Sequence, residues 1–96
     1  MVIHIVIFRW NKGVTQGDVR NVMSDLRHLK NVISQIVTLY CGENFSKFSK
    51  GYTHVVVITF KNRVDLATYR NHPAHQPIAK RVSELEADSV GVDLEV

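Results

Sequence analysis

The sequence predicts one α+β domain in which two helices cover one face of a four-stranded antiparallel sheet. Residues 2–10 and 53–60 alternate with the period of a strand, and residues 15–30 place apolar side chains at the spacing of an amphipathic helix. The expected order of elements is β-α-β-β-α-β, the ferredoxin-like arrangement. A chain of 96 residues suits a single core, so we expect one domain over residues 1–96.

The first strand and the first helix have the clearest patterns. Along residues 2–10 the two alternating sets of side chains are both largely apolar, so both faces of this strand must be covered. After the break at residues 11–13, Thr15 followed by Asp18 resembles a helix N-cap with an acidic first turn. The apolar stripe of this helix consists of Val19, Val22, Met23, Leu26 and Leu29.

The middle of the chain predicts two further strands joined by a loop. Residues 33–41 return to β-branched and aromatic side chains, which favours a strand. Residues 42–51 carry the Gly, Asn, Ser and Lys that are typical of a surface loop. In residues 53–60 the set of side chains that contains His54 alternates with the set that contains Val55, and both sets are lipophilic.

The last third of the chain predicts a helix in two pieces and a closing strand. The first piece ends at Asn71, because the residue before Pro73 avoids helical backbone angles. Pro77 is tolerated in a first helical turn, so we expect a second piece over residues 78–85. Residues 90–96 alternate again and predict the fourth strand.

Helices on one side leave the other face of the sheet bare, and we call this the open face. By alternation it carries Ile3, Ile5, Ile7, Val55 and Val57. A homodimer whose sheets close on each other, a dimeric α/β barrel, would bury these side chains. Each of them would contribute about 1.5–3 kcal/mol on burial. We therefore expect the chain to pair with itself through the open face.

Composition and charge exclude several classes of function. The formal net charge of +3 comes from Lys and Arg scattered among acids, and no basic cluster predicts nucleic-acid binding. The apolar run at residues 2–8 is too short to span a membrane and lacks the flanks of a signal peptide. Cys41 is the only cysteine, so no internal disulfide can form. We expect a cytoplasmic protein without membrane contact.

Histidines and one tyrosine form a candidate site. Alternation places His4 and His54 on the helix-covered faces of their strands, while Tyr69, His72 and His75 surround the proline bend. Imidazoles and a phenol suit acid–base chemistry on a carbonyl compound, because histidine gives and takes protons near neutral pH. The competing interpretation is that these side chains only pack and cap the fold. The expected ligand pocket is lined by Val6, Phe8, Met23, Leu26, Val56 and His72.

Three segments and one acid resemble a known family: residues 4–8 (HIVIF), 51–54 (GYTH) and 69–76 (YRNHPAHQ), with Asp93 near the end. These segments are similar to those of the stress-responsive A/B barrel family. The resemblance covers nearly the whole chain. It implies a ferredoxin-like homodimer, in agreement with the pattern of strands and helices.

The resemblance also implies roles for individual residues, because the family includes a plant polyketide cyclase. Tyr69 and His75 would be its acid–base pair for an aldol condensation, His4 and His54 would support them, and His72 would be structural. No metal or organic cofactor is implied, and two histidines near the bend supply only half of a tetrahedral ligand set. The first helix carries aliphatic side chains and Met23 where the cyclase has bulky aromatics, so a long-tailed substrate is not expected.

Three classes of function follow. The first is a homodimer that binds a small carbonyl or aromatic compound in a cleft between sheet and helices, with cofactor-free acid–base catalysis of the cyclase, lyase or isomerase type. In this class His54 would orient His75, and His4 would polarise a substrate oxygen. The second is a non-enzymatic stress-responsive or structural protein. The third is a small monooxygenase, by analogy of fold alone. The sequence leaves the substrate and the presence of catalysis open.

Overall fold

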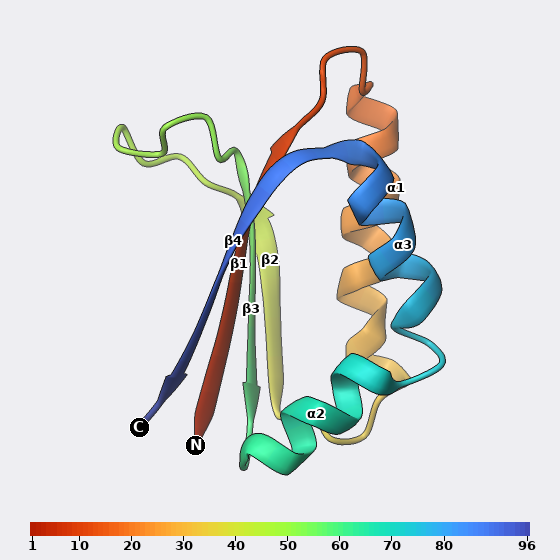
Figure 1. Cartoon of the computed structure of the whole chain (residues 1–96), viewed down its shortest axis with the longest axis vertical. Helices are drawn as coiled ribbons and strands as arrows, with labels where there is room; N and C mark the ends of the chain where they lie inside the picture. The colour runs from red at the N-terminus through yellow and green to blue at the C-terminus, as the bar shows by residue number, and fades with distance from the viewer.

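The computed structural model describes residues 1–96 and has the predicted α+β architecture. Its elements are β1 (Val2–Trp10), α1 (Gln16–His28), the short 3-10 helix η1 (Leu29–Asn31), β2 (Thr38–Glu43), β3 (His54–Phe60), α2 (Arg63–Asn71), α3 (Gln76–Leu85) and β4 (Glu86–Glu95). The strands form one antiparallel sheet in the order β2-β3-β1-β4, and the helices cover one of its faces (Figure 1). None of these helices combines the length and the apolar character that crossing a membrane requires.

The local signals for β1, α1 and the proline bend are confirmed. Thr15 caps α1 in a capping box, because its hydroxyl accepts from the Asp18 N–H while the Asp18 carboxylate accepts from the Thr15 N–H. The helix before Pro73 ends at Asn71, and α3 begins with Pro77 in its first turn. Strand β4 begins at Glu86, earlier than predicted, since the chain pairs with the end of β1 directly after α3.

The predicted boundaries of the second strand are wrong. Ile33 and Ile36 do not lie in a strand but in the turns that follow η1, where they are 0% and 3% exposed. Their β-branched side chains fill the core from an irregular segment, which a propensity for strands cannot distinguish from a strand. Strand β2 begins only at Thr38, which pairs with Thr59 of β3.

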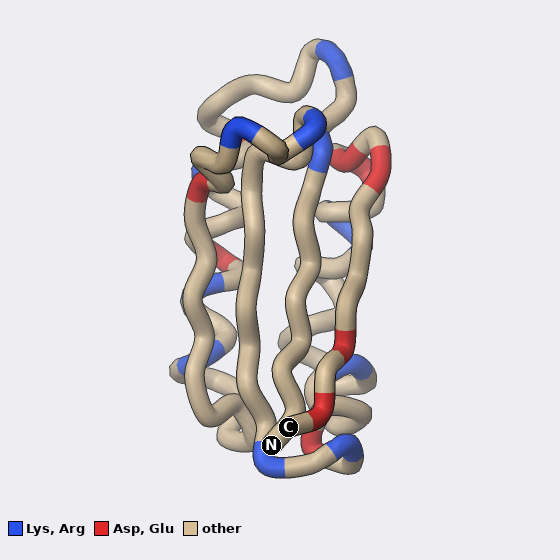
Figure 2. Tube along the Cα trace, turned by 90° about the vertical axis from the view of Figure 1, so that its left-hand side faces the viewer, with Lys and Arg blue, Asp and Glu red and all other residues tan.

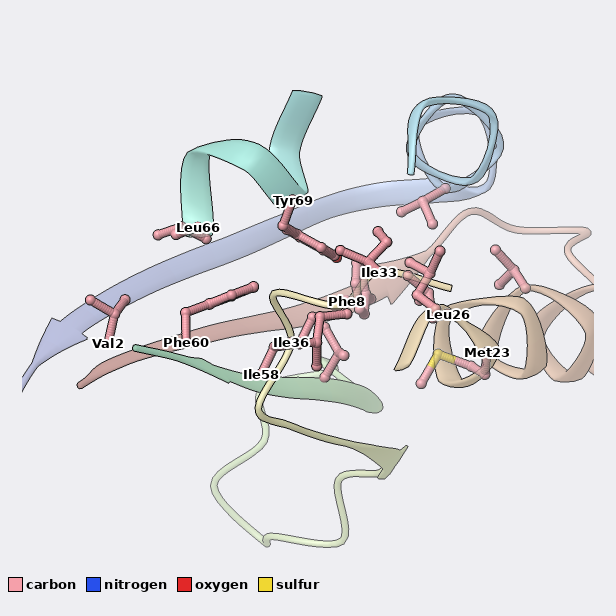
Figure 3. Close-up of a cluster of buried hydrophobic side chains, with 14 of the residues drawn as sticks. Val2, Phe8, Met23, Leu26, Ile33, Ile36, Ile58, Phe60, Leu66 and Tyr69 are labelled. Carbon is pink, nitrogen blue, oxygen red and sulfur yellow. The ribbon is translucent and has the colours of Figure 1, made fainter. Parts of the chain in front are cut away.

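The core lies between α1 and the covered face of the sheet (Figure 3). Val22 of α1, Ile33 and the β3 residues Val56, Ile58 and Phe60 are almost completely excluded from solvent. These strand residues belong to the alternating set predicted to face the helices. The burial pattern therefore confirms which face of each central strand is covered.

The open face is visible in Figure 2, where the sheet lies in front of the helices. Strand β3 carries no Lys, Arg, Asp or Glu, and β1 carries one such residue, Arg9, whereas acids lie along β4. The register extends the open face onto β4, because Ile3, Ile5 and Ile7 pair with Leu94, Val92 and Val90. The resulting surface is a continuous apolar sheet with no helix on it.

Removing the α1 cap should destabilise the fold. We expect Thr15→Ala to lower the free energy of unfolding by about 1 kcal/mol, because the Asp18 N–H loses its acceptor. Urea denaturation followed by circular dichroism measures this change. Ser24→Ala on the exposed side of α1 is the matched control and should cost nothing, since alanine favours helix. Equal stability of the Thr15→Ala and Ser24→Ala proteins would contradict the role of the capping box.

Candidate functional site

Three aromatic rings from different elements meet near the bend between α2 and α3. Tyr69 lies in the last turn of α2, His75 is the N-cap of α3, and His4 lies in β1. The ring centroids of Tyr69 and His75 are 4.4 Å apart, and those of His4 and Tyr69 are 6.0 Å apart. The structure thus brings together three of the four residues predicted to be catalytic.

The backbone of the bend explains why Tyr69 and His75 meet. His72 takes an extended conformation as the C-cap of α2, and its ring Nδ1 accepts from the Ala74 N–H at 3.0 Å. The chain then turns into α3, with the His75 N–H bonded to the His72 carbonyl. His72 therefore holds the bend by local hydrogen bonds, and it does not line either of two cavities at the ends of the covered face.

A hydrogen-bonded chain of charged groups stands beside the three rings. His4 and Asp93 are register partners on neighbouring strands, and His4 Nδ1 lies 2.6 Å from Asp93 Oδ1. Since a carboxylate only accepts, His4 donates through Nδ1–H and its Nε2 is left free for another partner. The second oxygen of Asp93 accepts from Arg70 Nη2 at 2.5 Å. Arg70 follows Tyr69 directly, so this chain of contacts ties the end of α2 to β1 and β4.

Burial moves the pKa values of the two closest rings in opposite directions. It raises the pKa of Tyr69 to about 12, against the opposing charge of Arg70, so the phenol stays protonated. It lowers the pKa of His75, although the Arg70 carbonyl accepts from Nδ1–H at 3.2 Å and favours the charged ring. Near neutral pH the pair consists of a phenol that can donate and an imidazole whose Nε2 can accept.

His54 lies away from this cluster, at the start of β3 and beside the other end of β1. It pairs with Phe8, four residues along β1 from His4, which corresponds to about 13 Å. Its Nδ1 accepts from the Trp10 indole N–H at 3.0 Å and lies 2.9 Å from the Thr53 hydroxyl. Burial lowers the pKa of His54, partly offset by the charge of Glu43. No contact supports the expectation that His54 orients His75.

Two cavities lie at opposite ends of the covered face. The larger has a volume of about 650 Å³ and opens between α1 and the segments that begin and end the β2–β3 loop; we call it the α1 cavity. Trp10 and His54 are among its lining residues. The smaller has about 300 Å³, and Arg70 and Asp93 line it between α2 and β4. Tyr69 and His75 line neither.

Most of the predicted pocket residues are core residues instead. Phe8, Met23, Leu26 and Val56 are buried in the core and Val6 packs against it, and among them only Met23 also lines the α1 cavity. Alternation and helical spacing identify an apolar face but do not show where that face is filled and where it is hollow.

Of the residues that line the α1 cavity, only Met23 and His54 were predicted as site residues, and the missed ones include Trp10, Arg20 and Arg27. Trp10 shares a strand face with His4, so alternation could have indicated it. Arg20 and Arg27 have the position of ordinary solvent-facing residues of an amphipathic helix, and only the tertiary structure places them beside a cavity. No group of three or more His, Cys, Asp or Glu side chains is arranged to hold a metal ion.

Comparison with known sequences identifies one family. The model for the Stress Responsive A/B Barrel Domain matches residues 2–96. The chain is 28% identical, over 97% of its length, to the stress-response A/B barrel domain-containing protein DABB1 of Arabidopsis thaliana, of which it spans 46%. It is also 28% identical to olivetolic acid cyclase of Cannabis sativa, over 75% of this chain and 73% of the cyclase.

Solved structures share the fold. A dimeric ferredoxin-like protein of unknown function from Thermobifida fusca is 26% identical, with a TM-score of 0.88 over 99% of this chain and 90% of that one. The hydroxynitrile lyase of Passiflora edulis has a TM-score of 0.91 over 99% of this chain and 92% of that one. At 20% identity, the second likeness concerns the fold alone.

Asp93→Asn should make the protein less stable at neutral pH and less sensitive to acid. Burial alone would raise the pKa of Asp93, but hydrogen bonds and charges from His4 and Arg70 hold it below its ordinary value of 3.8. Such a carboxylate stabilises the fold above that value and loses its contribution as pH falls through the lower folded pKa. Because the Asp93 side chain is 38% exposed, we expect a loss of at most about 1 kcal/mol.

Urea unfolding at neutral and at strongly acidic pH measures both effects. Glu95→Gln is the matched control, since Glu95 pairs with Arg63 on the exposed surface and should contribute less than about 0.5 kcal/mol. If Asp93→Asn left both the neutral stability and the acid dependence unchanged, the His4–Asp93–Arg70 chain would have no energetic role.

Proposed function

The chain belongs to the stress-responsive A/B barrel family, and on this premise we propose that it binds a small carbonyl or aromatic compound and transfers protons without a cofactor. The observation that carries the proposal is the contact between Tyr69 and His75, whose pKa values are shifted in opposite directions. A protonated phenol beside a neutral imidazole is an acid–base pair at the pH of the cell.

The proposed chemistry begins with proton abstraction from the carbon next to a carbonyl. His75 takes that proton on Nε2, because its Nδ1–H is bonded to the Arg70 carbonyl. The Tyr69 hydroxyl donates a hydrogen bond to the carbonyl oxygen, where the negative charge of the enolate develops. His4 holds its Nδ1–H on Asp93, so its Nε2 is the ring nitrogen left to contact the substrate. The enolate then attacks a second carbonyl or takes the proton back.

The named relatives support this general kind of activity. One relative is named olivetolic acid cyclase; it is 28% identical to this chain, and 73% of its length is covered. DABB1 is named only for stress response, and the chain spans 46% of that protein, about half its length. The activity, substrate and partners assigned to this chain are therefore proposals that depend on its own residues.

One observation favours the non-enzymatic alternative. Tyr69 is 2% exposed and packs on Phe60, with 5.3 Å between ring centroids, as a core residue would. Figure 3 shows its ring among the buried apolar side chains. Under this alternative, substitution at Tyr69 or His75 lowers the melting temperature and changes no ligand affinity, which separates the two functions experimentally.

We further propose that the chain forms a homodimer through the open face. Val90, Val92 and Leu94 are exposed there although they are apolar. The β2–β3 loop extends on the same side, and its Phe45 and Phe48 are 98% and 77% exposed (Figure 1). A contiguous apolar surface of this kind is typical of an interface. The 26% identical protein from Thermobifida fusca is described as dimeric, which supports the proposal.

Loss of either member of the acid–base pair should abolish proton transfer. A panel of aryl ketones and β-diketones is incubated in deuterium oxide, and exchange of the proton next to the carbonyl is followed by NMR. We expect the protein to accelerate exchange of at least one compound, and Tyr69→Phe and His75→Ala to slow it by about a hundredfold or more.

His28→Ala is the matched control for this experiment, because His28 is exposed in the last turn of α1. It should exchange protons like the unaltered chain. Each variant is checked for an unchanged circular dichroism spectrum and mass in solution. Full exchange activity in both Tyr69→Phe and His75→Ala would reject the assignment of the pair.

A charge on the open face should separate the dimer. Val92 is 49% exposed at the centre of β4, so Val92→Glu places a carboxylate in the proposed interface without disturbing the core. Sedimentation velocity should show a monomer. Val64→Glu on α2, at a side chain that is 72% exposed, is the matched control and should sediment as a dimer. A dimeric Val92→Glu protein would place the interface elsewhere.

A further inference from the structure

The α1 cavity has an apolar floor and a positively charged wall. Its apolar lining comes from β1, α1 and the turn between them, and consists of Trp10, Val14, Val19 and Met23. Arg20 and Arg27 stand on the same helix, on either side of Met23. A volume of about 650 Å³ is in the range of sites for small organic molecules.

Neither arginine is neutralised by a carboxylate of the chain. The five ion pairs of the structure involve other residues, and Arg27 makes only one long hydrogen bond, 3.4 Å from Nη2 to the Cys41 carbonyl. The two arginines are seven positions apart, which is about two helical turns, so their long side chains can converge over Met23. Two guanidinium groups are thus available to one ligand group.

The remaining polar groups of the cavity determine which ligand charge it favours. Trp10 donates its indole N–H to His54 Nδ1, so the neutral His54 ring carries its proton on Nε2 and can donate it. Glu43 also lines the cavity and pairs with neither arginine. With two positive charges and one negative charge on its wall, the cavity suits a monoanion better than a dianion such as a phosphate monoester.

We propose that the α1 cavity binds an organic carboxylate with an aromatic body, the carboxylate between Arg20 and Arg27 and the ring over Trp10 and Met23. Arginine matches the planar carboxylate in geometry and charge. A second oxygen of the ligand, a carbonyl or a phenol, would accept from His54 Nε2–H, and Glu43 would accept from a ligand hydroxyl. This inference goes beyond the proposed function, because Tyr69 and His75 do not line the α1 cavity.

The position of Trp10 provides a direct readout. It is the only tryptophan of the chain and lines the cavity, so its fluorescence responds to occupancy of this site. The ligands used are para-acetylbenzoate, an aryl ketone with a carboxylate, and para-acetylbenzamide, its neutral counterpart of the same shape. Melting temperature is measured in the same samples as a second signal of binding.

We expect the carboxylate to bind at least about tenfold more tightly than the amide, since charge-assisted hydrogen bonds are the stronger kind. Arg20→Gln and Arg27→Gln should each remove most of this preference and leave the affinity for the amide unchanged. Lys30→Gln is the matched control, because Lys30 is exposed in η1 and lies outside the cavity lining. It removes the same charge and should keep the preference.

Every other outcome overturns the inference, and the outcomes differ in what they leave standing. Equal affinities for carboxylate and amide, or arginine variants that bind like the unaltered chain, reject the anion site while the proposed binding of aromatic carbonyl compounds stands. Loss of the preference in Lys30→Gln as well would show a general effect of net charge. No change in fluorescence or melting temperature with either compound rejects the anion site, and proton exchange at Tyr69 and His75 then decides the proposed function separately.

Discussion

The two-sided apolar pattern of β1 is the constraint on which the rest of the structure depends. Because β1 pairs with β3 on one side and with β4 on the other, neither backbone edge of the strand is open to water. One set of its side chains faces α1 and the core, and the other set forms the centre of the open face. A single strand therefore determines both the packing of the subunit and the surface through which we propose that it pairs.

The same strand separates two kinds of chemistry. At its start, His4 lies beside Asp93 and the rings of the α2–α3 bend. At its end, Trp10 contacts His54 at the mouth of a cavity walled by arginines. Proton transfer and anion recognition are proposed for opposite ends of one layer, and the core side chains between them are closely packed. Motion of this packing would be needed to connect the two ends.

Periodicity predicted well which face of the sheet a side chain lies on, but it predicted less well where along the sheet that side chain lies. It placed His4 and His54 on the covered face correctly, but the side of a strand says nothing about distance along it, so their separation came only from the register. It failed at Ile33, where a core residue sits in a turn. The proline bend was predictable because its geometry is local, whereas the role of Arg27 depends on what lies across from the helix.

The acids along β4 have a consequence for assembly. This strand has a neighbour on one side only, so its free backbone groups could accept a further strand from another molecule. Figure 2 shows acids spaced along it. Asp88 lies near the start of β4 and Glu95 at its end. Asp88, Asp93 and Glu95 form ion pairs with Arg9, Arg70 and Arg63, so both signs of charge lie along this edge. A further strand could pair there only by displacing or burying these charges, which discourages lateral growth into fibrils.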